Sequence, residues 1–120
     1  MDALGKLGPM MGALLDTAAL RQRVIAENLA NAETPGYHAR EVGFDDAVAK
    51  AVQSGDLHAA EGAKPHVTER AGHPKSDGNT VNVELELGEM NRNALAYQSL
   101  LAVTLLKKRQ LQAAIGGRSG

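Results

Sequence analysis

The chain has 120 residues, of which 43% are hydrophobic, so it is large enough for one domain, and its core is aliphatic because it contains a single phenylalanine and no tryptophan. A formal net charge of −1 gives no general attraction to nucleic-acid phosphates or anionic lipid, and the absence of cysteine excludes disulfides, thiolate nucleophiles and cysteine-based zinc sites. No run approaches the roughly 18 apolar residues of a membrane span, and the N-terminus lacks the layout of a cleaved secretory signal, so composition alone indicates a cytoplasmic protein.

An amphipathic helix is predicted at the N-terminus. Its apolar residues fall on alternating three- and four-residue steps once Gly8 and Gln22 fill the two seven-residue gaps, and this is the period of one helix face. They are Leu4, Met11, Leu15, Ala18, Ile25, Leu29 and Ala32. The predicted helix spans residues 9–33, and Gly8-Pro9 either starts it or kinks a longer one, since proline is tolerated in the first turn.

A turn signal ends this helix. Pro35 disfavours helical geometry in the residue before it, and Pro35-Gly36 suits the centre of a type II turn because glycine can adopt positive φ. Tyr37 follows, and in a chain with 2% aromatic residues we expect its ring to anchor the next segment against the helix. Asn28 and Asn31 lie one helical turn apart before the stop, where their amides either satisfy the last helical carbonyls or contact another subunit.

The middle of the chain is predicted to carry little regular structure. Residues 44–53 have apolar residues at four-residue steps, which predicts a short helix. Residues 56–79 are dominated by polar residues, glycine and proline and are predicted to form an irregular surface loop, in which short extended pieces can lie on the helices. His58, His66 and His73 lie in this loop, but no His-Glu-x-x-His helix or short ligand pairing accompanies them, so we expect no metal or cofactor site.

A second long helix is predicted over residues 83–115. Apolar residues alternate with polar ones between Val81 and Leu87, which also suits a strand, but Asn82 can cap a helix and the apolar stripe then continues unbroken. The stripe consists of Val83, Leu87, Met90, Ala94, Tyr97, Leu101, Thr104, Lys108, Leu111 and Ile115. Gly116-Gly117 is predicted to end the helix, and basic residues 107–109 complement its dipole rather than form a nucleic-acid patch.

The second helix has more apolar surface than the first can cover. Residues 100–106 are apolar on nearly every side, with Leu100, Leu101 and Leu105 among them, whereas a two-helix hairpin covers one stripe. The second helix is also about 8 or 9 residues longer, which leaves roughly 12–14 Å of it without an intrachain partner unless residues 1–8 extend the first helix to meet it. We therefore expect these surfaces to pack against other subunits, and the isolated monomer to be partly disordered at both ends.

Two motifs resemble the bacterial flagellar rod and hook protein family. The first is Ala30-Asn31-x-x-Thr34-Pro35-Gly36-Tyr37, preceded by residues 21–29 with the sequence RQRVIAENL. The second is residues 77–84, DGNTVNVE, followed by a helical pattern that contains Asn93 and Tyr97-Gln98. The matches cover the N- and C-terminal parts of the chain and leave the middle unmatched. The short chain is most similar to the proximal-rod members of the family.

The helical patterns and the resemblance together imply an all-α fold. It would be an elongated antiparallel, coiled-coil-like pair of helices with a short middle helix and an irregular loop. This would be a single domain with an N-terminal helix in residues 1–34, a variable middle in residues 35–79 and a C-terminal helix in residues 80–120.

The function that the resemblance implies is structural and not enzymatic. The protein would assemble with itself and other rod subunits, through its terminal helices, into the proximal rod, a hollow drive shaft that transmits torque. Further partners would be the rod-to-ring adaptor and the membrane ring or export gate at the rod base. In contrast to the composition, the resemblance implies a periplasmic location, after export by the flagellar type III apparatus without a cleaved signal.

The resemblance also gives candidate functional residues. The turn at one end of the helical pair would be shaped by Asn28, Asn31, Thr34, Pro35, Gly36 and Tyr37. Packing within the helical pair and between subunits would use Met11, Leu15, Ala18, Ile25, Leu29, Leu87, Met90, Ala94, Tyr97, Leu100, Leu101 and Leu105. Ion pairs between subunits would involve Arg21, Arg23, Glu27 and Arg92.

Two other functions are compatible with the sequence. A small soluble helical adaptor or regulator would bind one partner helix through Leu100–Leu106. A small hydrolase would use the histidines, but the chain has no serine nucleophile elbow, phosphate-binding loop or dinucleotide fingerprint. We therefore expect no small-molecule substrate.

Overall fold

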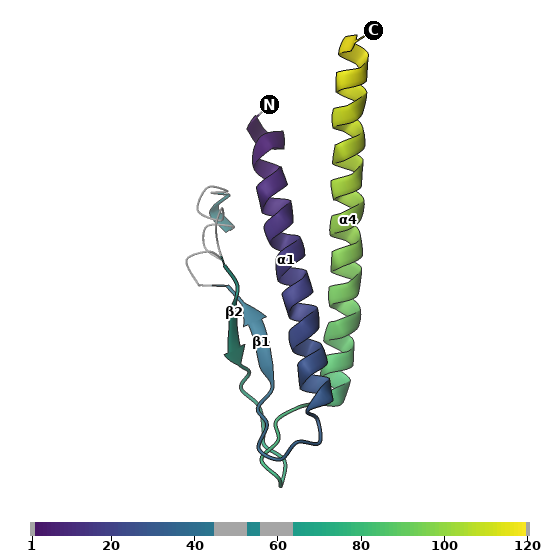
Figure 1. Ribbon diagram of the computed structural model, residues 1–120. Coiled ribbons are helices and arrows are strands. Elements are labelled where there is room, and N and C mark those ends of the chain that lie inside the picture. The colour runs from purple at the N-terminus through teal and green to yellow at the C-terminus, as the bar shows by residue number, and fades with distance from the viewer. Residues whose placement is uncertain (1, 45–52, 56–63, 120) are drawn as a thin grey trace.

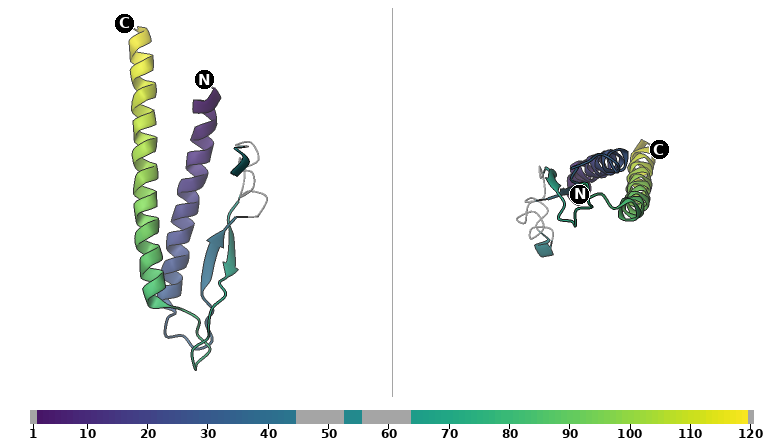
Figure 2. Two further views of the ribbon diagram at one scale, coloured as in Figure 1. Left: turned by 180° about the vertical axis from the view of Figure 1, so that it is seen from behind. Right: turned by 90° about the horizontal axis from the view of Figure 1, so that it is seen from below.

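The computed structural model describes residues 2–44, 53–55 and 64–119. Two long helices, α1 (Asp2–Ala30) and α4 (Val83–Ser119), run antiparallel side by side, and a two-stranded sheet of β1 (Arg40–Gly43) and β2 (His66–Glu69) lies along α1. Seen from below, α1 lies between the sheet and α4 (Figure 2). The molecule is elongated, with extents of 69 × 27 × 16 Å, and the turns that join α1 to β1 and β2 to α4 gather at one end, here called the base (Figure 1).

Helix α1 is longer at its start and shorter at its end than predicted. It begins at Asp2 rather than residue 9 and continues through Gly8-Pro9, so the alternative of a longer helix is the one observed. Pro9 has no backbone N–H to donate, so α1 continues through this residue without one of its helical hydrogen bonds. At the other end the regular helix stops at Ala30, and residues 31–33 form turns that lead into Pro35.

Helix α4 begins at Val83, as predicted. The side-chain oxygen of Asn82 accepts a hydrogen bond from the Leu85 backbone N–H at 3.2 Å, which is an N-cap, and the Glu86 N–H donates to the Asn82 carbonyl at 3.0 Å. The prediction that Gly116-Gly117 ends the helix was wrong, because neither glycine adopts the positive φ of a C-terminal cap and the helix continues to Ser119. Helix α4 has 37 residues and α1 has 29, so the excess of eight residues is present, although both helices have more residues than predicted and residues 2–8 do extend α1.

The all-α prediction was wrong because β1 and β2 form an antiparallel sheet. Arg40 pairs with Glu69 and Gly43 with His66, so two segments far apart in the sequence supply each other's hydrogen bonds. Val42 is buried against α1, whereas every residue of β2 is exposed. The predicted loop at residues 56–79 therefore contains a strand. Of the predicted short helix at residues 44–53, residues 45–52 lie outside the described residues.

The core is centred on α1 and is partly polar. Its buried hydrophobic members in the described residues are Met11, Ala18, Val24, Ile25, Ala39, Val42 and Val81. On α4 the buried side chains are a carboxylate, Glu86, and an amide, Asn93, and the Asn93 Nδ2 group donates to the Ala18 carbonyl and to Gln22 Oε1, both at 2.8 Å. The contact between the two helices is therefore set by polar groups that must be paired when buried.

Candidate functional site

The predicted turn at residues 34–37 is present at the base. Tyr37 N–H donates to the Thr34 carbonyl at 3.2 Å, and Gly36 has a φ of 74°, the positive value that a type II turn requires at this position. Asn31 Nδ2 donates to the Glu27 carbonyl at 2.8 Å. The Asn31 backbone N–H also donates to this carbonyl at 3.1 Å, so the side-chain amide adds a second hydrogen bond to a carbonyl that is already paired and does not satisfy a free one.

A second turn, around residues 77–80, interlocks with the first. Gly36 N–H donates to the Asp77 carbonyl at 2.9 Å, and Thr80 N–H donates to the Tyr37 carbonyl at 3.0 Å. Asn79 is fully buried, and its Nδ2 group donates to the carbonyls of Asn31 at 2.9 Å and Thr34 at 2.8 Å. The two motifs that are distant in the sequence are therefore halves of one hydrogen-bonded clasp.

The clasp depends on two glycines that face each other. A Cβ atom on Gly78, whose φ is 85°, would lie 3.4 Å from the Gly36 Cα atom, so the two backbones approach closely. Both positions have the left-handed backbone that glycine adopts without steric cost. The clasp therefore explains the glycine in each motif.

We expect Gly36→Ala to lower the free energy of unfolding by about 1 kcal/mol, because a Cβ atom disfavours positive φ. No heavy atom lies within 4 Å of the added Cβ, so the effect is conformational and not a clash. Urea unfolding followed by circular dichroism measures it. Gly43→Ala is the matched control, since Gly43 has equally open space and no positive φ. Equal effects of the two substitutions would contradict this explanation.

Asn28 connects α1, β1 and α4. Its side chain is 0% exposed, and Nδ2 donates to the Arg40 carbonyl at 2.8 Å and to Glu86 Oε2 at 3.1 Å. Its Oδ1 atom accepts from the Arg40 N–H at 3.0 Å and from the Tyr37 hydroxyl at 3.1 Å. Neither predicted role of Asn28 is correct, because its amide neither caps a helical carbonyl nor is accessible to another subunit. Tyr37 anchors the turn through this bond.

Charged side chains extend this network. Glu86, fully buried on α4, forms an ion pair with Arg70, which follows β2, and Arg70 also contacts Glu41 of β1 at 3.2 Å. Arg40 pairs with Glu27 of α1. Burial acts to lower the pKa of Arg70, but hydrogen bonds and attraction to Glu86 and Glu41 outweigh it and raise the pKa above its usual value, so this cation persists at all physiological pH.

The candidates for ion pairs between subunits are mostly engaged within the chain. Glu27 pairs with Arg40, Arg92 contacts Glu89 at 2.8 Å on the same helix, and Arg21 donates to the Val42 carbonyl at 3.4 Å. These contacts exist before any partner arrives. A role for the same groups between subunits would therefore require exchanging an existing partner.

The predicted packing residues divide between the two helices. On α1, Met11, Ala18 and Ile25 are buried and Leu15 and Leu29 are half-buried. On α4 none of the predicted set is fully buried. Met90, Ala94 and Leu100 are half-buried, and the exposed members are Leu87, Tyr97, Leu101 and Leu105. The packing surface of α4 is thus largely uncovered within one chain.

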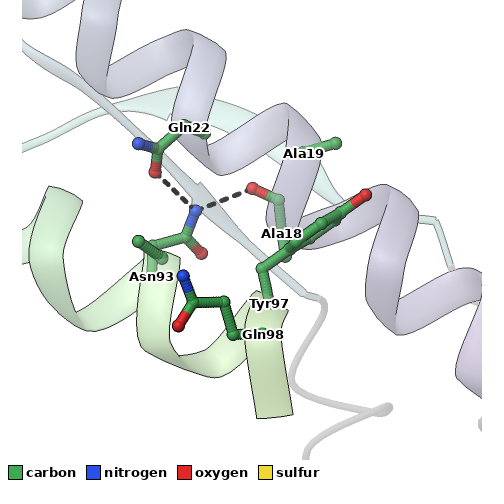
Figure 3. Close-up of a pocket in the computed structure, with 7 residues that line it drawn as sticks. Ala18, Ala19, Gln22, Asn93, Tyr97 and Gln98 are labelled. Atoms are coloured by element: carbon green, nitrogen blue, oxygen red, sulfur yellow. Dashed lines mark hydrogen bonds between the residues drawn. The ribbon is translucent and has the colours of Figure 1, made fainter. Parts of the chain in front are cut away.

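A groove of about 380 Å³ lies between α1 and α4 (Figure 3). It is lined by Ala18, Ala19, Gln22, Asn93, Ala94, Tyr97 and Gln98. Its hydrogen bonds join Asn93 to Ala18 and Gln22. The small alanine side chains therefore leave an open space beside Asn93, whose Nδ2 group already has its hydrogen-bond acceptors.

Sequence reasoning missed the residues that hold the base together. Asn79 is part of the second motif but has no predicted role, and Glu86 is not among the predicted site residues, although both side chains are buried. Arg70 lies in the predicted irregular loop, and Arg40 lies in residues 38–43, for which the sequence predicts only an extended connector. The sequence signal that could have indicated a buried charge was Glu86, an acidic residue in the helix turn where the apolar stripe begins.

The histidines do not form a site in the part of the chain that is described. His66 and His73 are exposed, and His58 lies outside the described residues. Within residues 2–44, 53–55 and 64–119, no group of three histidine, aspartate or glutamate side chains is placed to hold a metal ion.

Known proteins match most of the chain. The family described as "Flagella basal body rod protein" matches residues 11–38, which include the turn. A flagellar basal body rod protein FlgB from Aeromonas hydrophila is 32% identical over 99 residues, covering 72% of this chain and 75% of the relative. FlgB from Escherichia coli K12 is 32% identical over 106 residues, covering 73% and 77%, and one from Cereibacter sphaeroides is 34% identical over 107 residues, covering 81% and 84%. The chain therefore belongs to the family of FlgB-like flagellar basal body rod proteins and is a structural subunit of that rod.

Proposed function

We propose that the protein builds the proximal part of the rod by packing α1 and α4 against other copies and other rod subunits around a hollow, torque-transmitting shaft. The observation that carries this proposal is the exposed apolar surface of α4. Its large side chains beyond Tyr97 include Leu101 at 38% exposure, Leu105 at 55% and Ile115 at 68%. Monomers seldom leave so much contiguous apolar surface in water.

The energetics favour burial against other subunits. A fully buried leucine contributes about 1.5–3 kcal/mol, so covering the half-exposed aliphatic side chains of α4 would contribute on the order of 5 kcal/mol per subunit. Helix α1 is eight residues shorter and cannot cover the end of α4. The ends of both helices would be partly disordered in the monomer and order on assembly.

The base of the molecule positions the two helices and does not itself supply the apolar packing surface. Its ion pairs and hydrogen bonds join α1, the sheet and α4, so the two helices leave the base in a fixed relation. Glu86 is central because it reaches both Asn28 on α1 and Arg70 after β2. We propose that this clasp holds the helical pair in the geometry in which it packs, a positioning role with no catalytic step.

Further partners and a location follow from the proposal. The chain would contact the rod-to-ring adaptor and the membrane ring or export gate at the rod base. It would work in the periplasm after export without a cleaved signal peptide. Among the described residues, no helix has both the length and the apolar character needed to cross a membrane.

We expect Leu101→Asp and Leu105→Asp each to abolish rod assembly, because a carboxylate is too costly to bury in an apolar contact. The variants replace the wild-type gene, and swimming and the rod content of purified basal bodies are measured. Gln110→Asp is the control, since Gln110 is an exposed polar residue of the same helix. Normal rods with both leucine variants would refute the proposal. A cooperatively melting monomer with a one-to-one complex through Leu100–Leu106 would instead favour a helical adaptor.

A further inference from the structure

Helix α4 carries a second apolar stripe on the side that faces away from α1. Asn93 contacts α1, and Leu95, Ala102 and Leu106 follow it by two, nine and thirteen residues, which places them about 180–220° around the helix. Leu95 is 65% exposed and Leu106 is 56% exposed. Because α1 lies on the opposite side, the chain's own α1 cannot cover this stripe.

The groove of Figure 3 has the shape to receive one of these leucines. Ala18, Ala19 and Ala94 leave the space, and Tyr97 supplies an apolar wall. Ala19 and Tyr97 are exposed, so the groove is accessible from outside the chain. A large side chain that enters a groove lined by small ones is the usual way in which helices pack.

The positions of the charged residues favour Leu106 over Leu95 as the side chain that enters the groove. Asp16 precedes Ala19 by three residues on α1, and Arg109 follows Leu106 by three residues on α4. Because α1 and α4 are antiparallel, a second copy in the same orientation with Leu106 beside Ala19 brings Arg109 level with Asp16. Both side chains are exposed and form no ion pair within the described residues.

A two-fold pairing of the outward stripes is disfavoured by the same charges. In an antiparallel contact of this kind, Leu95 of one copy would face Leu106 of the other. Arg92 precedes Leu95 by three residues and Arg109 follows Leu106 by three residues, so the two arginines would then face each other. Two opposed like-charged pairs would result. Of these two contacts, only the head-to-tail one brings opposite charges together, and such a contact continues from copy to copy instead of closing as a dimer.

We infer that Leu106 on the outward face of α4 in one copy seats in the groove between α1 and α4 of the next copy, with Arg109 paired to Asp16. This inference rests on the proposed function and names the partner of the groove. The contact also sets the axial displacement between neighbouring copies. Leu106 of one copy lies level with Ala94–Tyr97 of its neighbour, which come about 10 residues before position 106 on α4, so the copies are displaced by roughly 15 Å along the helix axis.

Cysteine cross-linking tests the contact directly, because the chain has no cysteine of its own. Ala19→Cys combined with Leu106→Cys, in cells that assemble basal bodies, should give dimers and larger disulfide-linked species of this chain on mild oxidation. Ala19→Cys with Leu95→Cys is the control, since Leu95 is at least as exposed but lies roughly 16 Å along the helix from Leu106. Cross-links to a protein of different mass would overturn the choice of a second copy.

Charge reversal gives an independent readout. Asp16→Arg and Arg109→Asp should each reduce the number of assembled rods severalfold, and the combined variant should recover to within about twofold of wild type. No recovery together with no Ala19–Leu106 cross-link would overturn the inference. If Leu101→Asp still blocks assembly in that case, the proposed function stands and only this contact is wrong. Normal assembly of Leu101→Asp would refute the proposed function itself.

Discussion

Glu86→Ala is expected to lower the free energy of unfolding by about 3 kcal/mol, because removing one partner of a buried ion pair leaves the other without compensation. Glu86 is 0% exposed, and its carboxylate accepts from both Asn28 and Arg70. This loss of unfolding free energy is at the lower end of the range for buried ion pairs, because the Arg70 side chain is 21% exposed and keeps Glu41 as a partner. Urea unfolding followed by circular dichroism gives the free energy.

The control for this prediction is Glu84→Ala. Glu84 is an exposed carboxylate in the same first turn of α4, so its replacement removes a similar charge from the helix dipole but no buried partner. We expect that control to change the free energy of unfolding by less than about 0.5 kcal/mol. Similar effects of the two substitutions would mean that the Glu86 pair does not stabilise the base.

Asn79→Ala is expected to cost about 3 kcal/mol, because three hydrogen bonds of roughly 1 kcal/mol each disappear in a buried site. Two of them bind the carbonyls of Asn31 and Thr34, and the third is accepted by Asn79 Oδ1 from the Val81 N–H at 2.7 Å. The clasp between the two motifs then loses its central side chain. Hydrogen exchange of the Val81 amide should become faster, and urea unfolding gives the free energy.

Asn91→Ala is the matched control for Asn79. Asn91 is an exposed asparagine of α4, and alanine is the better helix former, so this change should be neutral or slightly stabilising. An unchanged Val81 exchange rate in Asn79→Ala would contradict the clasp. Equal unfolding free energies for Asn79→Ala and Asn91→Ala would also contradict it.

These predictions separate the two ends of the molecule. Substitutions at the base should act on the isolated chain, because the partners of Glu86 and Asn79 lie within it. Substitutions at Leu101 or Leu106 should act on assembly, because those side chains are exposed in the single chain. A variant of the base that assembles poorly should therefore also unfold more easily, whereas Leu101→Asp should not.

Local chemistry in the sequence determined the helices and the turn. The start of α4 follows from Asn82 and the stripe after it, and the stop of α1 follows from Pro35-Gly36, since capping and proline geometry involve neighbouring residues. The excess length of α4 agrees with the prediction, although both helices have more residues than predicted. Glycine was a weaker signal at residues 116–117, because it permits a helix end without enforcing one.

Only the tertiary structure decided the sheet and the network at the base. The pairing of β1 with β2, and of Glu86 with Asn28 and Arg70, joins residues that are far apart in the chain. In the sequence Glu86 looks like any acidic residue in a first helical turn, and Asn79 like any loop amide. Their burial depends on which segments fold against them, and a buried polar group acquires its role from those partners.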